Sequence, residues 1–68
     1  MPERLANRLK ERRTELGLTQ AELAEKVGVT RKTVNTVENG VFVPSALLAI
    51  KLAQALKLPV EELFWIEP

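Results

Sequence analysis

The stretch 19–40 reads TQAELAEKVGVTRKTVNTVENG and constrains the fold of this 68-residue chain more than any other part of it. It contains two short helical patterns, residues 20–27 and residues 31–39, with a tight turn between them. A hydroxyl side chain that can cap a helix precedes each pattern, and a glycine follows it. Because the turn is so short, we expect the two helices to cross steeply and to touch.

Local signals specify the ends and the inward sides of both helices. Thr19 and Glu22 have the spacing of a capping box, in which each side chain accepts a hydrogen bond from the other residue's backbone N–H. Gly28 can adopt the positive φ that the turn requires. Ala24 is small where the two backbones come closest. Each helix also has one apolar stripe, and the residues that form the two stripes are Leu23, Val27, Val29, Val34 and Val37.

Polar side chains that can contact DNA bases lie on the outer side of the second helix. They are Arg31, Lys32, Asn35 and Thr36. Arginine or lysine commonly pairs with guanine and asparagine with adenine, and the methyl group of threonine can contact the methyl group of thymine. This is the design of a helix-turn-helix, which presents its second helix to the major groove of DNA. The alternative is a solvated polar surface on an ordinary helical bundle.

The stretch and its flanks resemble the Cro/C1-type (XRE) repressor family over roughly the whole chain. The resemblance implies a single all-α, five-helix, repressor-like domain over residues 1–68. It also implies that Gln20, which opens the 20–27 helix, binds a DNA phosphate. Thr30 and Asn39 would contact the DNA backbone on the same basis; such contacts set the register but carry no sequence information. A role in capping alone is the alternative for Gln20 and Thr30.

Hydrophobic periodicity predicts the other three helices. The first runs from about residue 3 to residue 16, with Leu5, Leu9 and Leu16 on its buried side. The fourth runs from about residue 46 to residue 57 after the N-cap candidate Ser45, and a short fifth runs from Pro59 to residue 64 or 65. The segment 41–43 is predicted to be loop, in which Phe42 either folds back onto the core or joins a partner surface.

Arg13 falls on or beside the buried side of the first helix, so its guanidinium needs a carboxylate partner. Glu38 is the leading candidate, because repressors of the family that the chain resembles carry a matching Arg–Glu pair between the first and third helices. Such a pair need not add net stability, but removing one partner alone is costly. The alternative is that Arg13 extends into solvent.

The C-terminal half holds more apolar side chains than one small monomer needs to bury. Those that we assign to a dimer interface are Leu47, Ile50, Phe64, Trp65 and Ile66. Members of the family that the chain resembles commonly dimerise through this region, and two-fold symmetry would place two reading helices one DNA turn apart. The alternatives are that Trp65 folds over the core, or that a different protein covers this C-terminal apolar surface.

Composition excludes several classes of function. The chain has neither cysteine nor histidine, so disulfides, common zinc sites and the usual nucleophile–base pairs of enzymes are excluded. Residues 1–32 hold eight Lys or Arg and five Glu, whereas residues 33–68 hold two and four, so the N-terminal half is the one suited to phosphates. Neither a signal peptide nor a membrane-spanning run is present in the sequence.

We therefore expect a cytoplasmic transcriptional regulator rather than an enzyme, with no cofactor, no metal and no membrane partner. The expected partner is double-stranded DNA, bound as a homodimer at a short inverted repeat, and repression is the expected mode of control. The alternative is a protein–protein module on the same fold, such as an antitoxin or a small adaptor.

Overall fold

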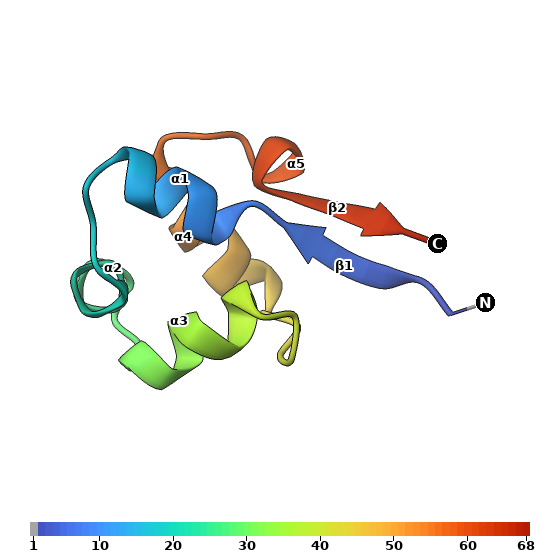
Figure 1. Ribbon diagram of the computed structural model, residues 1–68, viewed down its shortest axis with the longest axis horizontal. Helices are drawn as coiled ribbons and strands as arrows, with labels where there is room; N and C mark the ends of the chain where they lie inside the picture. The colour runs from blue at the N-terminus through green and yellow to red at the C-terminus, as the bar shows by residue number, and fades with distance from the viewer. Residues whose placement is uncertain (1) are drawn as a thin grey trace.

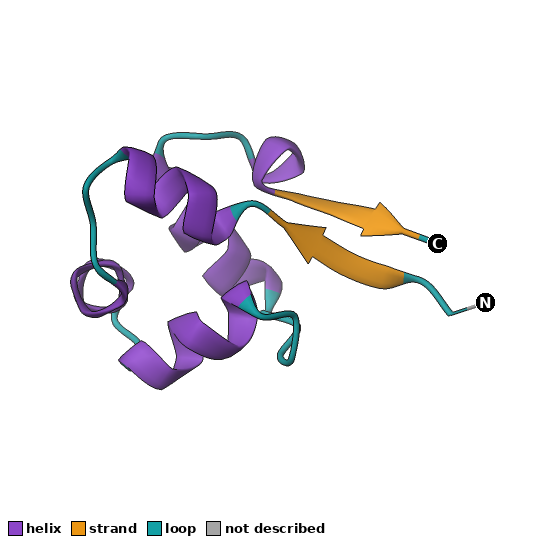
Figure 2. Cartoon of the chain, in the orientation of Figure 1, coloured by secondary structure: helices purple, strands orange, loops and turns teal. Residues whose placement is uncertain are grey.

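The computed structural model describes residues 2–68, in which five helices and two short strands follow one another along the chain. The elements in order are β1 (Arg4–Asn7), α1 (Leu9–Glu15), α2 (Gln20–Val27), α3 (Arg31–Glu38), α4 (Ala46–Leu56), α5 (Val60–Leu63) and β2 (Phe64–Glu67). The helices gather at one end of the molecule, and the two strands project from them side by side (Figures 1 and 2). No helix within residues 2–68 is long and apolar enough to cross a bilayer.

The fold is mostly helical, as expected, and the two strands add a small antiparallel sheet to it. Arg4 lies opposite Glu67 and Asn7 lies opposite Phe64, so the sheet joins the first and last parts of the described chain. The segment expected to begin the first helix at residue 3 is strand β1, and α1 begins only at Leu9. The C-terminal helix is also shorter than predicted, because the chain is extended from Phe64 onward.

One hydrogen bond explains where α1 begins. The side-chain Oδ1 of Asn7 accepts a hydrogen bond from the backbone N–H of Leu9 at 2.9 Å. This satisfies a donor that a helix start would otherwise leave without a partner, and Leu9 is fully buried. The leucine spacing in residues 5–16 fits a helix, but the partner that keeps residues 4–7 extended lies some 60 positions away in the sequence.

The hydrophobic core lies among the helices, and each helix contributes to it. The largest fully buried side chains are Leu9, Leu23, Leu52, Leu56, Leu63, Val34 and Val37. Phe64 belongs to the same cluster, with only 6% of its surface exposed. The assignment of Phe64 to a dimer interface is therefore wrong, because its ring is already used to close the core at the junction of α5 and β2.

Candidate DNA-binding surface

The capping box and the glycine predicted from the sequence are present in the structure and set the ends of α2 and the turn into α3. The Thr19 Oγ1 accepts a hydrogen bond from the N–H of Glu22 at 3.0 Å, and Glu22 Oε1 accepts one from the N–H of Thr19 at 2.9 Å. Gly28 ends α2 in the left-handed conformation, with a φ of 76°. The N–H of Val29 then donates to the carbonyl of Ala24 at 3.0 Å, which closes the turn and directs the chain into α3.

The outer face of α3 carries the predicted base-contacting residues. Arg31, Lys32 and Asn35 are exposed, while Val34 and Val37 on the other side of the same helix are buried. Thr36 is half-buried, and its Oγ1 donates to the carbonyl of Thr33 at 2.9 Å. Its hydroxyl hydrogen is thus already used, and its methyl group and oxygen lone pair are what it could offer to a base.

The three residues expected to contact the DNA backbone lie at the ends of α2 and α3. Thr30 is exposed and caps α3, because its Oγ1 accepts a hydrogen bond from the N–H of Thr33 at 3.2 Å. Asn39 is exposed at the C-terminal cap, and its Nδ2 donates to the carbonyl of Asn35 at 2.8 Å. Gln20 is the first residue of α2 and is half-buried.

A shallow groove connects the start of α2 with the start of α3. Its volume is about 450 Å³, and it is lined by Arg13, Thr14, Gly17, Leu18, Thr19, Gln20, Ala21 and Arg31. Arg31 lines it together with the first residues of α2, the end of a helix that favours anions.

The ion pair expected between the first and third helices is present in the structure. Arg13 Nε donates to Glu38 Oε2 at 2.7 Å, and the two side chains are only 9% and 3% exposed. A second donor of the guanidinium, Nη1, binds the carbonyl of Leu18 at 2.7 Å. Arg13 therefore fixes the end of α1 and the start of the following loop to the C-terminal end of α3, and does not extend into solvent.

Comparison with known proteins agrees with this geometry. The profile of the helix-turn-helix family matches residues 9–63, which is most of the chain. The protein belongs to the helix-turn-helix family of the Cro/C1 (XRE) type. It is 46% identical over 63 residues to the uncharacterized HTH-type transcriptional regulator YgzD of Bacillus subtilis, a match that covers 93% of this chain and 96% of that protein. The family consists of DNA-binding transcription regulators, which are not enzymes.

Two solved structures of helix-turn-helix proteins are similar to this chain over about four fifths of its length. The restriction-modification controller protein C.AhdI of Aeromonas hydrophila is 42% identical, with a TM-score of 0.77 over 81% of this chain and 83% of that one. The P22 c2 repressor, solved in complex with a synthetic operator, is 28% identical, with a TM-score of 0.77 over 79% and 82%. The five-helix repressor-like fold predicted from the sequence is thereby confirmed, with the small sheet added to it.

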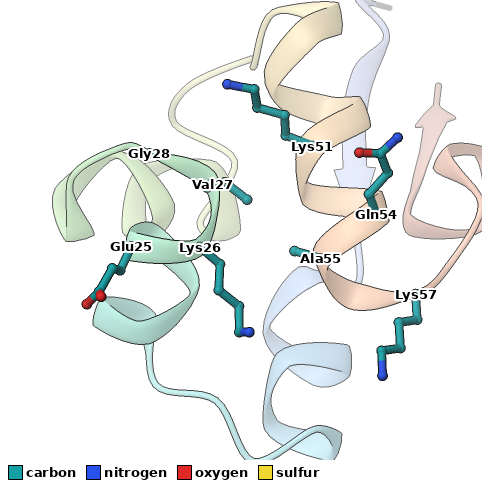
Figure 3. A pocket seen from close by; sticks show the side chains of 8 residues that line it. All are labelled: Glu25, Lys26, Val27, Gly28, Lys51, Gln54, Ala55 and Lys57. Carbon is teal, nitrogen blue, oxygen red and sulfur yellow. The ribbon is translucent and has the colours of Figure 1, made fainter.

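A second groove of this helix-turn-helix protein, larger than the one at the start of α2, lies apart from α3. It has a volume of about 690 Å³ and lies between α2 and α4, lined by Glu25, Lys26, Val27, Gly28, Lys51, Gln54, Ala55 and Lys57. Figure 3 shows Lys26 extending from α2 toward α4, while Glu25 points away from α4. Sequence reasoning missed this groove, because its lysines are far apart in the chain. Three lysines and one glutamate line this groove, so its net charge is positive. Within residues 2–68, no group of His, Cys, Asp or Glu could hold a metal.

The expected dimer-interface residues divide into exposed and covered ones. Leu47 and Ile66 are each 66% exposed and Ile50 is 48% exposed. Trp65 is half-buried, with the Arg8 guanidinium 5.2 Å from the centre of its ring. Three further apolar side chains are exposed in the loop between α3 and α4, for which a partner surface was one of the two alternatives: Val41, Phe42 and Val43. Phe42 is 47% exposed, so it does not fold fully onto the core.

Proposed function

We propose that this regulator is a sequence-specific repressor that binds a short inverted repeat of duplex DNA as a homodimer. The observation that carries the proposal is the outer face of α3. Arg31, Lys32 and Asn35 are exposed there on a helix whose other side is held in the core, so a rigid element presents three side chains able to read base edges. The P22 c2 repressor, which was solved with an operator, has the same fold.

The proposed mechanism divides the contacts into two kinds. Gln20, Thr30 and Asn39 would bind phosphates on either side of α3, which fixes how the helix enters the major groove. Arg31, Lys32, Asn35 and Thr36 would then contact base edges, and these contacts would distinguish one sequence from another. Repression follows if the site overlaps a promoter, because a bound dimer excludes other proteins from it. Such a protein acts on the chromosome, and we therefore place it in the cytoplasm.

The homodimer is supported by the apolar surface that the monomer leaves in solvent. Leu47 and Ile50 are exposed one turn apart on α4, and Ile66 is exposed on β2. Exposed apolar side chains that lie next to one another, as Leu47 and Ile50 do on α4, mark a surface for a partner. A two-fold dimer would place two copies of α3 about 34 Å apart, the spacing of successive major grooves on one side of DNA.

Selection of bound duplexes from a random DNA pool tests the proposal. The wild-type protein should enrich a two-fold symmetric motif with half-sites about 10 base pairs apart. The variant Arg31→Ala/Lys32→Ala should lose or change that motif. The matched control is Lys26→Ala/Lys51→Ala, which removes the same charge from the groove between α2 and α4 and should keep the motif.

The results that oppose the proposal are equally specific. Salt-sensitive binding to every duplex, without an enriched motif, would refute sequence-specific recognition. The dimer is tested separately by sedimentation at low concentration, where a monomer would refute it. A monomer that also enriches no motif would favour the alternative, a module that acts on another protein.

A further inference from the structure

The buried carboxylate of Glu38 binds more than its arginine. Arg13 donates to it from Nε to Oε2 at 2.7 Å and from Nη2 to Oε1 at 3.4 Å. The same Oε1 also accepts a hydrogen bond from Nε2 of Gln20 at 3.0 Å. Because the Glu38 side chain is only 3% exposed, these three donors replace the water that the carboxylate would otherwise bind. A residue at the C-terminal end of α3 is thus tied directly to the first residue of α2.

This hydrogen bond fixes the orientation of the Gln20 amide. A side-chain amide has two N–H donors and one carbonyl acceptor, and one of the two donors is used by Glu38. The amide is planar, so fixing one N–H also fixes the direction of the second N–H and of the carbonyl. A glutamine that is held in this way loses less side-chain entropy when it binds a ligand than one that rotates freely.

Arg13 removes the electrostatic obstacle to this arrangement. A bare carboxylate beneath a DNA phosphate would repel it, but the guanidinium against Glu38 makes the buried pair neutral overall. Each nitrogen of the Arg13 guanidinium donates one hydrogen bond, that of Nη1 to the carbonyl of Leu18, and the residue is 8% exposed. The pair therefore supports Gln20, which lines the groove at the start of α2 together with Arg13, whereas Glu38 is not among the lining residues.

We propose that Glu38 is a positioning residue for DNA binding, which orients the Gln20 amide toward a backbone phosphate while Arg13 neutralises its charge. The inference rests on the phosphate contact of Gln20 in the proposed function. It gives the carboxylate a second role besides pairing with Arg13 in the fold. Because Glu38 is fixed at the end of α3, its hydrogen bond also fixes the side chain of Gln20 at the start of α2.

A double-mutant cycle on DNA affinity tests the inference. The four proteins are the wild type, Gln20→Met, Arg13→Met/Glu38→Met, and the variant that carries all three substitutions. Methionine retains much of the side-chain volume and removes the buried charges as a pair, an exchange that folded proteins often tolerate. Affinity for a mixed-sequence duplex at low salt is measured by fluorescence anisotropy, because a phosphate contact acts on every sequence.

The expected result is coupling between the two sites. Gln20→Met should weaken binding about tenfold in the wild type, the typical loss for one hydrogen bond to a charged group. In the Arg13→Met/Glu38→Met background the same substitution should weaken binding about twofold or less, because the amide is no longer held. An equal loss in both backgrounds overturns the inference, as does no loss in the wild type. Absence of binding to any duplex would instead refute the proposed function, and the inference with it.

A measurement on the wild type keeps the inference testable if the paired substitution prevents folding. The side-chain amide hydrogens of Gln20 and Gln54 are compared by NMR, since Gln54 lies exposed on α4. One Nε2 hydrogen of Gln20 should be shifted and should exchange with water more slowly than either hydrogen of Gln54. Equal exchange at both glutamines would show that Glu38 does not hold the amide, and would overturn the inference.

Discussion

Replacing Asn7 with alanine removes a side chain that joins the end of β1 to the start of α1 and to the end of α3. Asn7 Oδ1 accepts from the N–H of Leu9 at 2.9 Å, and its Nδ2 donates to the carbonyl of Val37 at 3.0 Å. The first loss resembles the loss of a helix cap, about 0.5–2 kcal/mol. The second is about 0.5–1.5 kcal/mol. It is not larger, because the carbonyl of Val37 keeps a bond from the N–H of Gly40 at 3.1 Å.

The free energy of unfolding should therefore fall by about 2 kcal/mol in Asn7→Ala, which corresponds to a Tm lowered by about 8–16 °C for a domain of this size. Asn7→Asp is the matched control. It keeps the acceptor for Leu9 at the start of α1 and loses only the donor to Val37, so at neutral pH its stability should lie between those of the wild type and Asn7→Ala.

Urea denaturation followed by circular dichroism measures both variants. A loss below about 0.5 kcal/mol in Asn7→Ala would contradict the reasoning, because a surface substitution without a structural role gives a change of that size. Equal losses in Asn7→Ala and Asn7→Asp would show that the cap on Leu9 contributes nothing, and that the start of α1 is set by packing instead.

Three further predictions concern the DNA surface and the helix ends. Arg31→Ala should cost about 1–3 kcal/mol of binding at one base position and relax specificity there, whereas an equal loss on all sequences, measured by competition binding, would make Arg31 a phosphate contact. Lys57 ends α4 with a φ of 58°, so Lys57→Gly should raise the free energy of unfolding by about 0.5–1 kcal/mol; Lys57→Ala, which keeps the strain, should show no gain in the same urea titration. The backbone N–H of Thr19, followed by its side chain, holds the pKa of Glu22 below its usual value of 4.5. The stability that Glu22 contributes is therefore present above the unfolded pKa and is lost as the pH falls through the folded pKa. When the free energy of unfolding is measured against pH, the wild type should exceed the non-titrating variant Glu22→Gln at neutral pH, and the two values should converge only at low pH.

The helix-turn-helix could be predicted from the sequence because each of its signals is local. Thr19 and Glu22 of the capping box are three positions apart, and Gly28 and Thr30 act on the chain next to them. Strand β1 could not be predicted in the same way, because residues 4–7 become extended only by pairing with residues 64–67. The leucine spacing of residues 5–16 favours a helix and the pairing of residues 4–7 with residues 64–67 favours a strand, and the pairing determines the structure.

The candidate site also has features that local sequence predicts and features that depend on distant contacts. Exposure of Arg31, Lys32 and Asn35 follows from the apolar period of α3, which places Val34 and Val37 inside. The hydrogen bond from Gln20 to Glu38 joins residues 18 positions apart and depends on the crossing angle of α2 and α3, which no local pattern specifies. Phe64 was assigned to a partner surface for a similar reason, since an apolar residue near the C-terminus does not indicate by itself which neighbour covers it.

The contacts around α3 explain how a short helix can hold its exposed residues rigidly, as the proposed reading of DNA bases requires. Asn7 binds the carbonyl of Val37, and Arg13 and Gln20 bind the carboxylate of Glu38, so three other segments of the chain meet the last turn of α3. Within residues 2–68, the contacts described for its first turn are its cap and apolar packing. An eight-residue helix would be unstable alone. Tethering its C-terminal end to β1, α1 and α2 fixes its direction and leaves the exposed residues of its N-terminal end free to enter a groove.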